Sequence, residues 1–244
     1  MRHGSQSMKT KAKHLVFLAA ALTTVAAAQE HPVVADGIWA RGKVVVVFAS
    51  FEACPGHPYR RVQPLVSHDG GKSWNPSGPR FEGSDFEYIL DTGKALWIAG
   101  EGYAEGPTHD PFLLLFGPDN ADWPEFEIYN GGADLKAIAL EAKTGKFRAW
   151  VEHIDISSDD SPPPIFLHQS LDGGQTWEQT RQVPRVPKSA PGFRFFEEIP
   201  RQSGSWRIIG DAVTGTVIEH LQADSKWHRI PDLPPQPCTA EELD

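Results

Sequence analysis

The sequence of 244 residues predicts an all-β chain, a β-propeller of four four-stranded antiparallel blades with aspartate-containing hairpin turns. Three observations predict this fold. A tryptophan recurs at spacings of 49, 54 and 50 residues, at Trp74, Trp123, Trp177 and Trp227. A short apolar stretch and a turn with an aspartate precede each of these tryptophans. Further upstream, each unit has a glycine followed by a strongly apolar stretch, at Gly42, Gly93, Gly145 and Gly204.

Each repeat contains three clear strands and a fourth after the tryptophan. First strands such as residues 86–91 ("FEYILD") and 135–141 ("LKAIALE") lead through tight Thr-Gly turns into the apolar second strands. The third strand ends at the aspartate turn, and the fourth follows the tryptophan. Four antiparallel strands repeated about every fifty residues are typical of propeller blades.

The domain boundaries follow from the two ends of the chain. Three lysines precede an apolar run at residues 14–28 that ends in three alanines, which is typical of a secretory signal peptide cleaved after Ala28. Met8 is an alternative start. The run is too short and too rich in alanine and threonine for a membrane span. We therefore expect a signal peptide over 1–28, the propeller over 29–234 and a tail over 235–244, in a secreted or periplasmic protein without stable membrane insertion.

The charge of the chain excludes some partners. The net charge is −9, and removing residues 1–28 takes away four bases and no acids, which leaves −13. Such an excess of acids repels nucleic acid and anionic membranes. We expect a monomer whose partner is a glycan or a protein.

The two cysteines predict a disulfide. Cys54 and Cys238 both remain after signal cleavage, and an even pair in an oxidising compartment favours a bond. Two free or separately buried thiols are the alternative. In a propeller the first and last blades are neighbours, so a bond between the tail and a loop of the first blade would clasp them together.

An octapeptide occurs twice, as "SHDGGKSW" at residues 67–74 and as "SLDGGQTW" at 170–177. In a tight hairpin the aspartate accepts hydrogen bonds from the turn's own N–H groups, and the glycines permit positive φ. The tryptophan supplies an apolar body that packs between sheets. We interpret the motif as structural, because a catalytic acid at Asp69 or Asp172 would need a free carboxylate. The structural residues are Ser67, Asp69, Gly71 and Trp74, with Ser170, Asp172, Gly174 and Trp177.

The octapeptide resembles the Asp-box pattern, Ser-x-Asp-x-Gly-x-Thr/Ser-Trp, also called the bacterial neuraminidase repeat. The chain looks like a member of the sialidase-like superfamily of Asp-box propellers, which includes sialidases, xyloglucan-active glucanases, sortilin-like receptors and photosystem assembly factors. This resemblance implies the propeller fold. It does not imply activity, because catalytic and non-catalytic members carry the same box.

The catalytic set of sialidases does not carry over. Its Phe-Arg-Ile-Pro motif is absent, although "FRFFEEIP" at residues 193–200 has some of the letters in another order. No spacing selects three arginines for a carboxylate. Among the tyrosines only Tyr103, in "EGYAEG", has a carboxylate-rich setting. This favours a chain that is not an enzyme.

If the chain binds a ligand, the loops between second and third strands are the expected place, because loops on a rigid scaffold carry function. An acid recurs near the end of each second strand. A bound cation at this acidic loop face is possible, but no metal-ligand spacing is present, so no metal or cofactor is predicted. A solvated acidic rim is the alternative. The predicted ligand-binding face comprises Glu52, Arg60, Arg61, Glu101, Tyr103, His109, His153, Asp155 and Asp211.

We therefore expect a secreted, non-catalytic binding module for a glycan or protein ligand. The alternative is a divergent sialidase-like glycoside hydrolase with Glu101, Tyr103 and Asp155 as candidate catalytic residues. A second alternative, a periplasmic assembly factor, rests on the resemblance alone.

Overall fold

The structure is a computed structural model that describes residues 33–56, 59–78, 80–83, 85–103, 109–117, 123–154, 162–211 and 215–238. These residues all belong to the unit His31–Asp244. The expected signal peptide, residues 1–28, and the end of the tail, residues 239–244, lie outside them. The described part of the chain contains no helix long and apolar enough to span a membrane.

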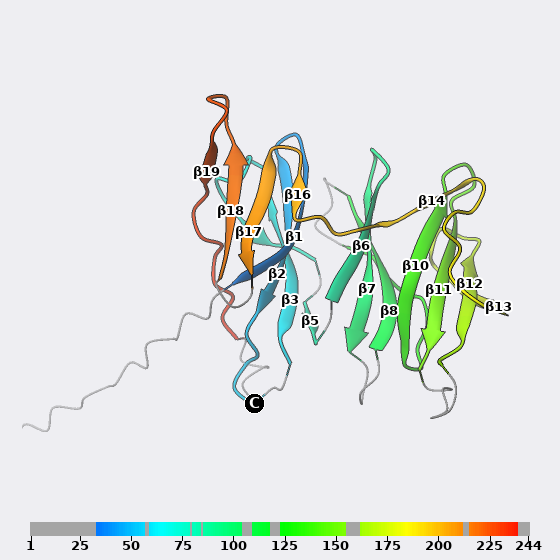
Figure 1. Cartoon of the computed structure of the whole chain (residues 1–244). Helices are drawn as coiled ribbons and strands as arrows, with labels where there is room; N and C mark the ends of the chain where they lie inside the picture. Colours follow the sequence, from blue (N-terminus) through cyan, green and yellow to red (C-terminus); the bar gives the residue numbers. More distant parts are fainter. Residues whose placement is uncertain are drawn as a thin grey trace, which may run out of the picture. The chain divides into compact units, whose positions relative to one another are not determined.

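The described residues form four antiparallel sheets, as the repeat predicts (Figure 1). The first sheet contains β1 (Val34–Arg41), β2 (Val44–Phe51), β3 (Arg61–Ser67), β4 (Asn75–Pro76) and β5 (Phe81–Glu82). The second contains β6 (Asp85–Asp91), β7 (Leu96–Tyr103), β8 (His109–Phe116), β9 (Glu125–Glu127) and β15 (Glu197–Glu198). The third contains β10 (Ala133–Glu141), β11 (Lys146–His153), β12 (Ile165–Ser170), β13 (Glu178–Val183) and β14 (Phe193–Phe195). The fourth contains β16 (Gln202–Ser203), β17 (Trp206–Asp211), β18 (Gly215–Leu221) and β19 (Trp227–Arg229).

These sheets confirm the predicted all-β chain of four antiparallel blades. The second strand of each repeat begins just after the predicted glycine, and a short fourth strand follows the predicted tryptophan or begins with it. Strand β2 is buried along almost its whole length. Its sequence, "VVVVFASF", has no polar alternation because apolar neighbours cover both of its faces.

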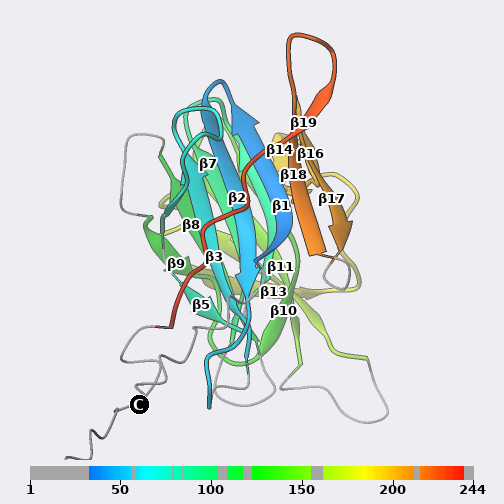
Figure 2. The same cartoon turned by 90° about the vertical axis from the view of Figure 1, so that its left-hand side faces the viewer.

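Apolar side chains fill the spaces between the sheets. One cluster joins the fourth and first sheets, and β1 packs beside β17 (Figures 1 and 2). A second cluster joins the first and second sheets, and a third joins the second and third. The last blade therefore packs on the first, as the sequence analysis expects. None of the clusters formed by described residues contains side chains from both the third and the fourth sheets.

A segment that links the third and fourth sheets runs across the edges of the first strands (Figure 1). We call residues 193–203 the crosspiece. It pairs first with β10 through β14, then with β6 through β15. The carbonyl oxygen of Pro200 next accepts a 2.9 Å hydrogen bond from the N–H of Ile38 in β1. The crosspiece thus connects the inner edges of three sheets before it enters the fourth.

Candidate functional site

The first strands of three sheets each carry a β-bulge, and each bulge presents a titratable side chain. The pairing register shifts between Ala35 and Gly37, between Phe86 and Tyr88, and between Leu135 and Ala137. The residues left without a partner across the strand are Asp36, Glu87 and Lys136. Bulges re-aim side chains and occur often beside active sites. The three bulged residues therefore mark a candidate site along the edge that the crosspiece crosses.

Glu87 is the half-buried acid of this group. Its Oε2 atom is buried and has no hydrogen-bond partner. Burial raises the pKa of this carboxyl to about 7, and the nearby charges of Glu101, Asp85 and Asp134 add to the effect. Close to neutral pH, Glu87 is therefore a mixture of the acid and the carboxylate, so it both donates and accepts hydrogen bonds.

Asp36 lies on the neighbouring first strand and faces the same pocket. Its carboxyl accepts a hydrogen bond from Ser50 and lies 4.0 Å from the Arg60 guanidinium. Partial burial raises the pKa of this carboxyl, although 47% of the side-chain surface is exposed. A pocket of about 310 Å³ is lined by Asp36, Gly37, Phe86, Glu87, Tyr88, Glu198 and Ile199. The pocket lining thus combines three acidic side chains with the aromatic residues Phe86 and Tyr88.

Lys136 is the cation of the three bulges. Its ammonium lies 2.9 Å from carboxylate oxygens of both Asp134 and Glu152. These partners raise its pKa even though burial acts in the opposite direction. Lys136 therefore carries a permanent positive charge close to the acids of the second sheet.

Glu101, a predicted catalytic and ligand-binding residue, lies beside this site and is buried, with 8% of its surface exposed. One of its carboxylate oxygens accepts a hydrogen bond from the N–H of Leu135, and the other lies 3.1 Å from Nδ1 of His109. Burial raises its pKa. The structure thus brings the predicted Glu101 and His109 together.

Glu101, His109 and Asp134 are the described residues whose side chains could hold a metal ion. One ligand atom from each lies within 4.8 Å of the other two. One imidazole and two carboxylates suit zinc or manganese better than calcium or magnesium. The ammonium of Lys136 already neutralises Asp134, however, and one carboxylate oxygen of Glu101 already accepts a hydrogen bond from the N–H of Leu135. Both acids of this cluster therefore already have partners within the protein.

Of the other predicted site residues, Arg60 lies beside the pocket, 4.0 Å from Asp36, and the rest do not gather with these acids. Glu52 and Asp211 are exposed and lie at the ends of second strands. His153 is buried, with its Nε2 atom 3.1 Å from Nε2 of His168. Arg61 is buried as well, with 2% of its surface exposed. The predicted Asp155 lies outside the described residues.

Of the predicted Tyr103, the structure describes only the backbone, which pairs with that of His109 at the end of β7. Tyr88, which the sequence analysis did not single out, is the tyrosine of the pocket. Burial raises its pKa to about 12. Its hydroxyl lies 3.5 Å from the carbonyl oxygen of Leu135.

Both octapeptide turns use their aspartate internally. Asp69 accepts hydrogen bonds from the N–H groups of Lys72 and Ser73 and from the hydroxyls of Ser67 and Ser73. Asp172 accepts equivalent bonds from Ser170 and Thr176. These donors lower the pKa of both carboxyls, that of Asp172 to about 2. A carboxylate held in this way is a poor proton donor or acceptor for a ligand.

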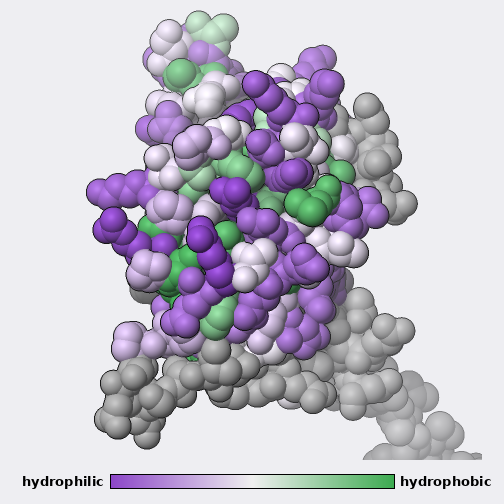
Figure 3. Space-filling model, turned by 90° about the vertical axis from the view of Figure 1, so that its right-hand side faces the viewer, coloured by the Kyte–Doolittle hydropathy of each residue, from purple (hydrophilic) through white to green (hydrophobic). Residues whose placement is uncertain are grey.

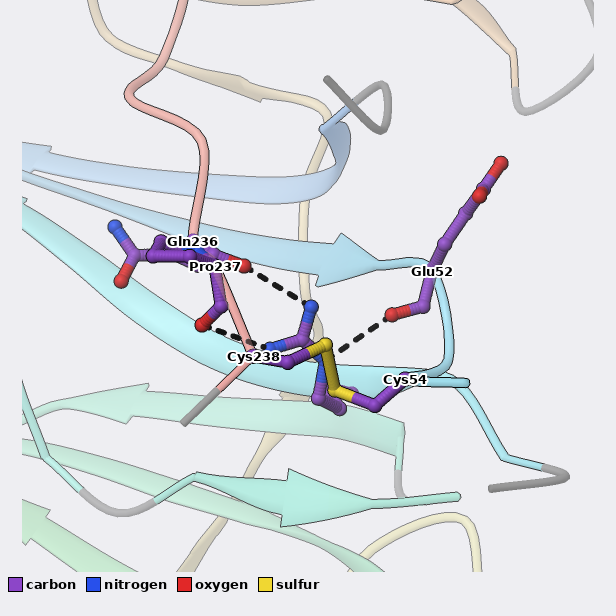
Figure 4. The surroundings of a disulfide bond; sticks show 6 residues. Glu52, Cys54, Gln236, Pro237 and Cys238 are labelled. Carbon is purple, nitrogen blue, oxygen red and sulfur yellow. Dashed lines mark hydrogen bonds between the residues drawn. A yellow bond between two sulfur atoms is a disulfide. The ribbon is translucent and has the colours of Figure 1, made fainter. Parts of the chain in front are cut away.

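The predicted disulfide is present. Cys54 is bonded to Cys238, with 5.8 Å between their Cα atoms. The guanidinium of Arg61 donates to the carbonyl oxygens of Glu52, Gln236 and Pro237. Figure 4 shows these three residues around the disulfide. Figure 2 shows the red C-terminal segment running along the first sheet toward this point. A disulfide fits a protein outside the cytoplasm.

No protein-family model and no curated protein matches the chain. Its structure is similar to that of a protein of unknown function from Dyadobacter fermentans DSM 18053, with a TM-score of 0.43 and 13% identity over 82% of this chain and 83% of that one. It is also similar to the GH93 α-L-arabinofuranosidase of Fusarium graminearum in complex with arabinobiose (TM-score 0.38, 9% identity, 76% and 70% covered).

A further similar structure is the α-L-arabinofuranosidase Arb93A of Fusarium graminearum with an iminosugar inhibitor (TM-score 0.38, 13% identity, 81% and 63% covered). At TM-scores below 0.5, these likenesses carry no argument about what the chain does.

Proposed function

We propose that the chain is an exported binding protein that holds a neutral glycan in the pocket between β1, β6 and β15. The observation that carries this proposal is the buried, unpartnered Oε2 atom of Glu87. A buried polar atom without a partner costs about 1–3 kcal/mol. A ligand hydroxyl would recover this cost once the Glu87 carboxyl rotates and turns the buried oxygen toward the pocket.

The chemistry of the pocket suits hydroxyl groups. Sugar hydroxyls donate and accept hydrogen bonds, and a carboxyl with a pKa of about 7 does both near neutral pH. The side chains of Asp36 and Glu198 supply further acceptors, and the ring of Tyr88 supplies apolar surface. The pocket volume of about 310 Å³ is at the lower limit for small-molecule sites and suits one or two sugar rings.

The charge of the pocket supports a neutral ligand. Three acids line it and no base does, so that Arg60, 4.0 Å from Asp36, offsets only part of the negative charge. An anionic sugar such as a sialic acid would be repelled, which argues against a sialidase-like ligand. The two Asp-box carboxylates are engaged within their own turns, so they support the scaffold and not the site.

The test is a binding survey by calorimetry with neutral and anionic oligosaccharides, using the mature protein. We expect one neutral class to bind at least tenfold more tightly than any anionic sugar. Glu87→Leu, which removes the polar group, should weaken this binding at least tenfold, and Glu178→Gln, on the exposed strand β13, should leave it unchanged. Binding that Glu87→Leu leaves unaltered, or no binding of neutral sugars below millimolar concentration, contradicts the proposal.

Glycoside hydrolysis is a second candidate, and one observation favours it. A general acid for glycoside cleavage needs a raised pKa, and that of Glu87 is about 7. Release of reducing sugar from the bound oligosaccharide separates the two candidates. Turnover that Glu87→Gln abolishes while binding persists identifies a hydrolase, whereas binding without turnover identifies the binding module.

A further inference from the structure

A second hollow lies on the outer face of the third sheet, away from the pocket at the first strands. It lies between strands β11 to β13 and the segment 184–191 that follows β13, and its volume is about 640 Å³. We call it the basic groove. Four of its lining residues are cationic, namely Arg148, Arg181, Arg185 and Lys188, and none is acidic. Figure 3 views the molecule from this side and shows hydrophilic side chains around small apolar areas.

These four cations have no carboxylate partners. Among the residues that the structure describes, none of the four forms an ion pair, and Arg148 alone makes a ring contact, over Phe193 at 4.2 Å from the ring centroid. Some basic side chains elsewhere in the described residues are paired with acids, for example Arg41 with Asp91 and Arg207 with Glu219, and the unpaired ones that flank the exposed turns, such as Lys43 and Lys226, are not gathered around one hollow. The groove is thus a concentrated positive surface on a chain whose net charge is −9.

Unpaired like charges repel one another, so this arrangement costs free energy in the isolated chain. An anionic partner would remove that repulsion. The guanidinium groups of three arginines present planar pairs of donors that match carboxylates. The charge of the groove therefore indicates a ligand that carries several carboxylates.

The floor of the groove indicates what else the ligand carries. It is aliphatic and includes Leu167, Val183 and Val186. The aromatic residue of the floor, Trp150, is 3% exposed and is stacked on Phe195 at a centroid distance of 5.2 Å. No open aromatic face is therefore offered to a sugar ring, whereas aliphatic surface accepts an apolar side chain.

We propose that the basic groove binds an acidic peptide segment of a partner protein, with carboxylates on the cationic rim and an apolar side chain on the aliphatic floor. The site is separate from the pocket at Asp36 and Glu87, and the two ligands differ in charge and in chemistry. The chain would then carry one surface for a glycan and another for a protein.

The experiment measures fluorescence anisotropy with a labelled synthetic octapeptide of glutamates and leucines. Three competitors accompany it. One has serine in place of leucine, one has glutamine in place of glutamate, and one is oligogalacturonate. We expect the acidic, leucine-containing peptide to bind at least tenfold more tightly than any one of the three competitors. Its affinity should fall steeply with salt, because screening weakens contacts between exposed charges.

Variants assign the binding to the groove. Arg181→Glu with Arg185→Glu should weaken peptide binding at least tenfold and leave glycan binding at Glu87 unchanged. The control, Lys43→Glu with Lys226→Glu, makes the same change in charge at exposed turns of the first and fourth sheets and should have less than a twofold effect. Thermal melts confirm that each variant is folded.

Three outcomes overturn the proposal. The first is no binding of the leucine-containing peptide at millimolar concentration. The second is equal binding of the serine-containing peptide or of oligogalacturonate, which would make the groove a general polyanion site. The third is an equal loss in the groove variant and the control, because this would reflect net charge and not the groove.

Discussion

The Nη2 atom of Arg61 donates a 3.0 Å hydrogen bond to the carbonyl oxygen of Gln236, across 175 residues of chain. The same guanidinium bonds the carbonyl oxygens of Glu52 and Pro237, beside the disulfide between Cys54 and Cys238. An arginine that the sequence places on a ligand-binding loop thus holds the C-terminal segment against the first blade.

Replacing Arg61 should therefore destabilise the fold. Arg61→Met keeps apolar bulk but leaves three carbonyl oxygens without their donor, and we expect a loss of about 2–4 kcal/mol in unfolding free energy. Arg60→Met is the matched control, because the Arg60 side chain is 56% exposed, and it should cost less than about 0.5 kcal/mol. Urea denaturation measures both. Equal effects of the two variants would show that Arg61 does not hold the tail.

Reducing the disulfide should lower the stability of the chain and leave it a monomer, because the bond joins two cysteines of one chain. Cys54 and Cys238 are separated by 184 residues, so the bond restricts a long loop in the unfolded chain. Loss of a native disulfide typically costs about 2–5 kcal/mol. The melting temperature with and without reductant measures the effect, and Cys54→Ser with Cys238→Ser should reproduce it. Two titratable thiols in the native exported protein would contradict the bond.

The crosspiece should depend on a glycine in β1. A Cβ atom at Gly37 would lie 2.0 Å from Cγ2 of Ile199, so no larger residue fits there while the crosspiece is in place. We expect Gly37→Ala to cost about 1–3 kcal/mol through overpacking. In a double-mutant cycle, Ile199→Ala should relieve much of this cost, because it removes the clashing methyl group. Strict additivity of the two changes would show that Gly37 and Ile199 do not compete for space.

Much of the strand layout could be predicted from the sequence, because the signals are local. A turn glycine such as Gly93 lies just before β7, and a tryptophan such as Trp123 lies just before β9, so each marks the start of a strand within its own repeat. The crosspiece could not be predicted in this way. Its pairing of Glu198 with Tyr88 joins residues 110 positions apart, and nothing in the local pattern of "FRFFEEIP" specifies that partner.

The candidate site was only partly predictable, for a related reason. The acid that recurs at the ends of the second strands predicts Glu101, but Glu87 and Asp36 lie within first strands. A bulge adds one residue to a strand, so simple alternation does not reveal which way that side chain points. One signal was available. Asp36 and Glu87 each lie six residues before a turn glycine, Gly42 and Gly93, at equivalent positions of two repeats.

The raised pKa of Glu87 should make stability depend on pH. Its carboxyl has a pKa of about 7, against 4.5 for an ordinary glutamate, so the folded state favours the protonated form. The stability from this group is present below pH 4.5 and is lost as the pH rises toward 7. Glu87→Gln stays neutral, and solvent screens part of the charge of the partly exposed natural side chain. The advantage of this variant over the natural chain should therefore be about 1–2 kcal/mol larger at pH 8 than at pH 5. Urea denaturation at both pH values measures the difference. The contributions of Glu101 and Asp36 to the pH dependence largely cancel in it, because both proteins contain these residues.

The control variant, Glu178→Gln, should show no such change. An advantage of Glu87→Gln that is the same at both pH values would mean that Glu87 is ionised in the folded protein, and the pocket would then favour cations over neutral hydroxyl groups.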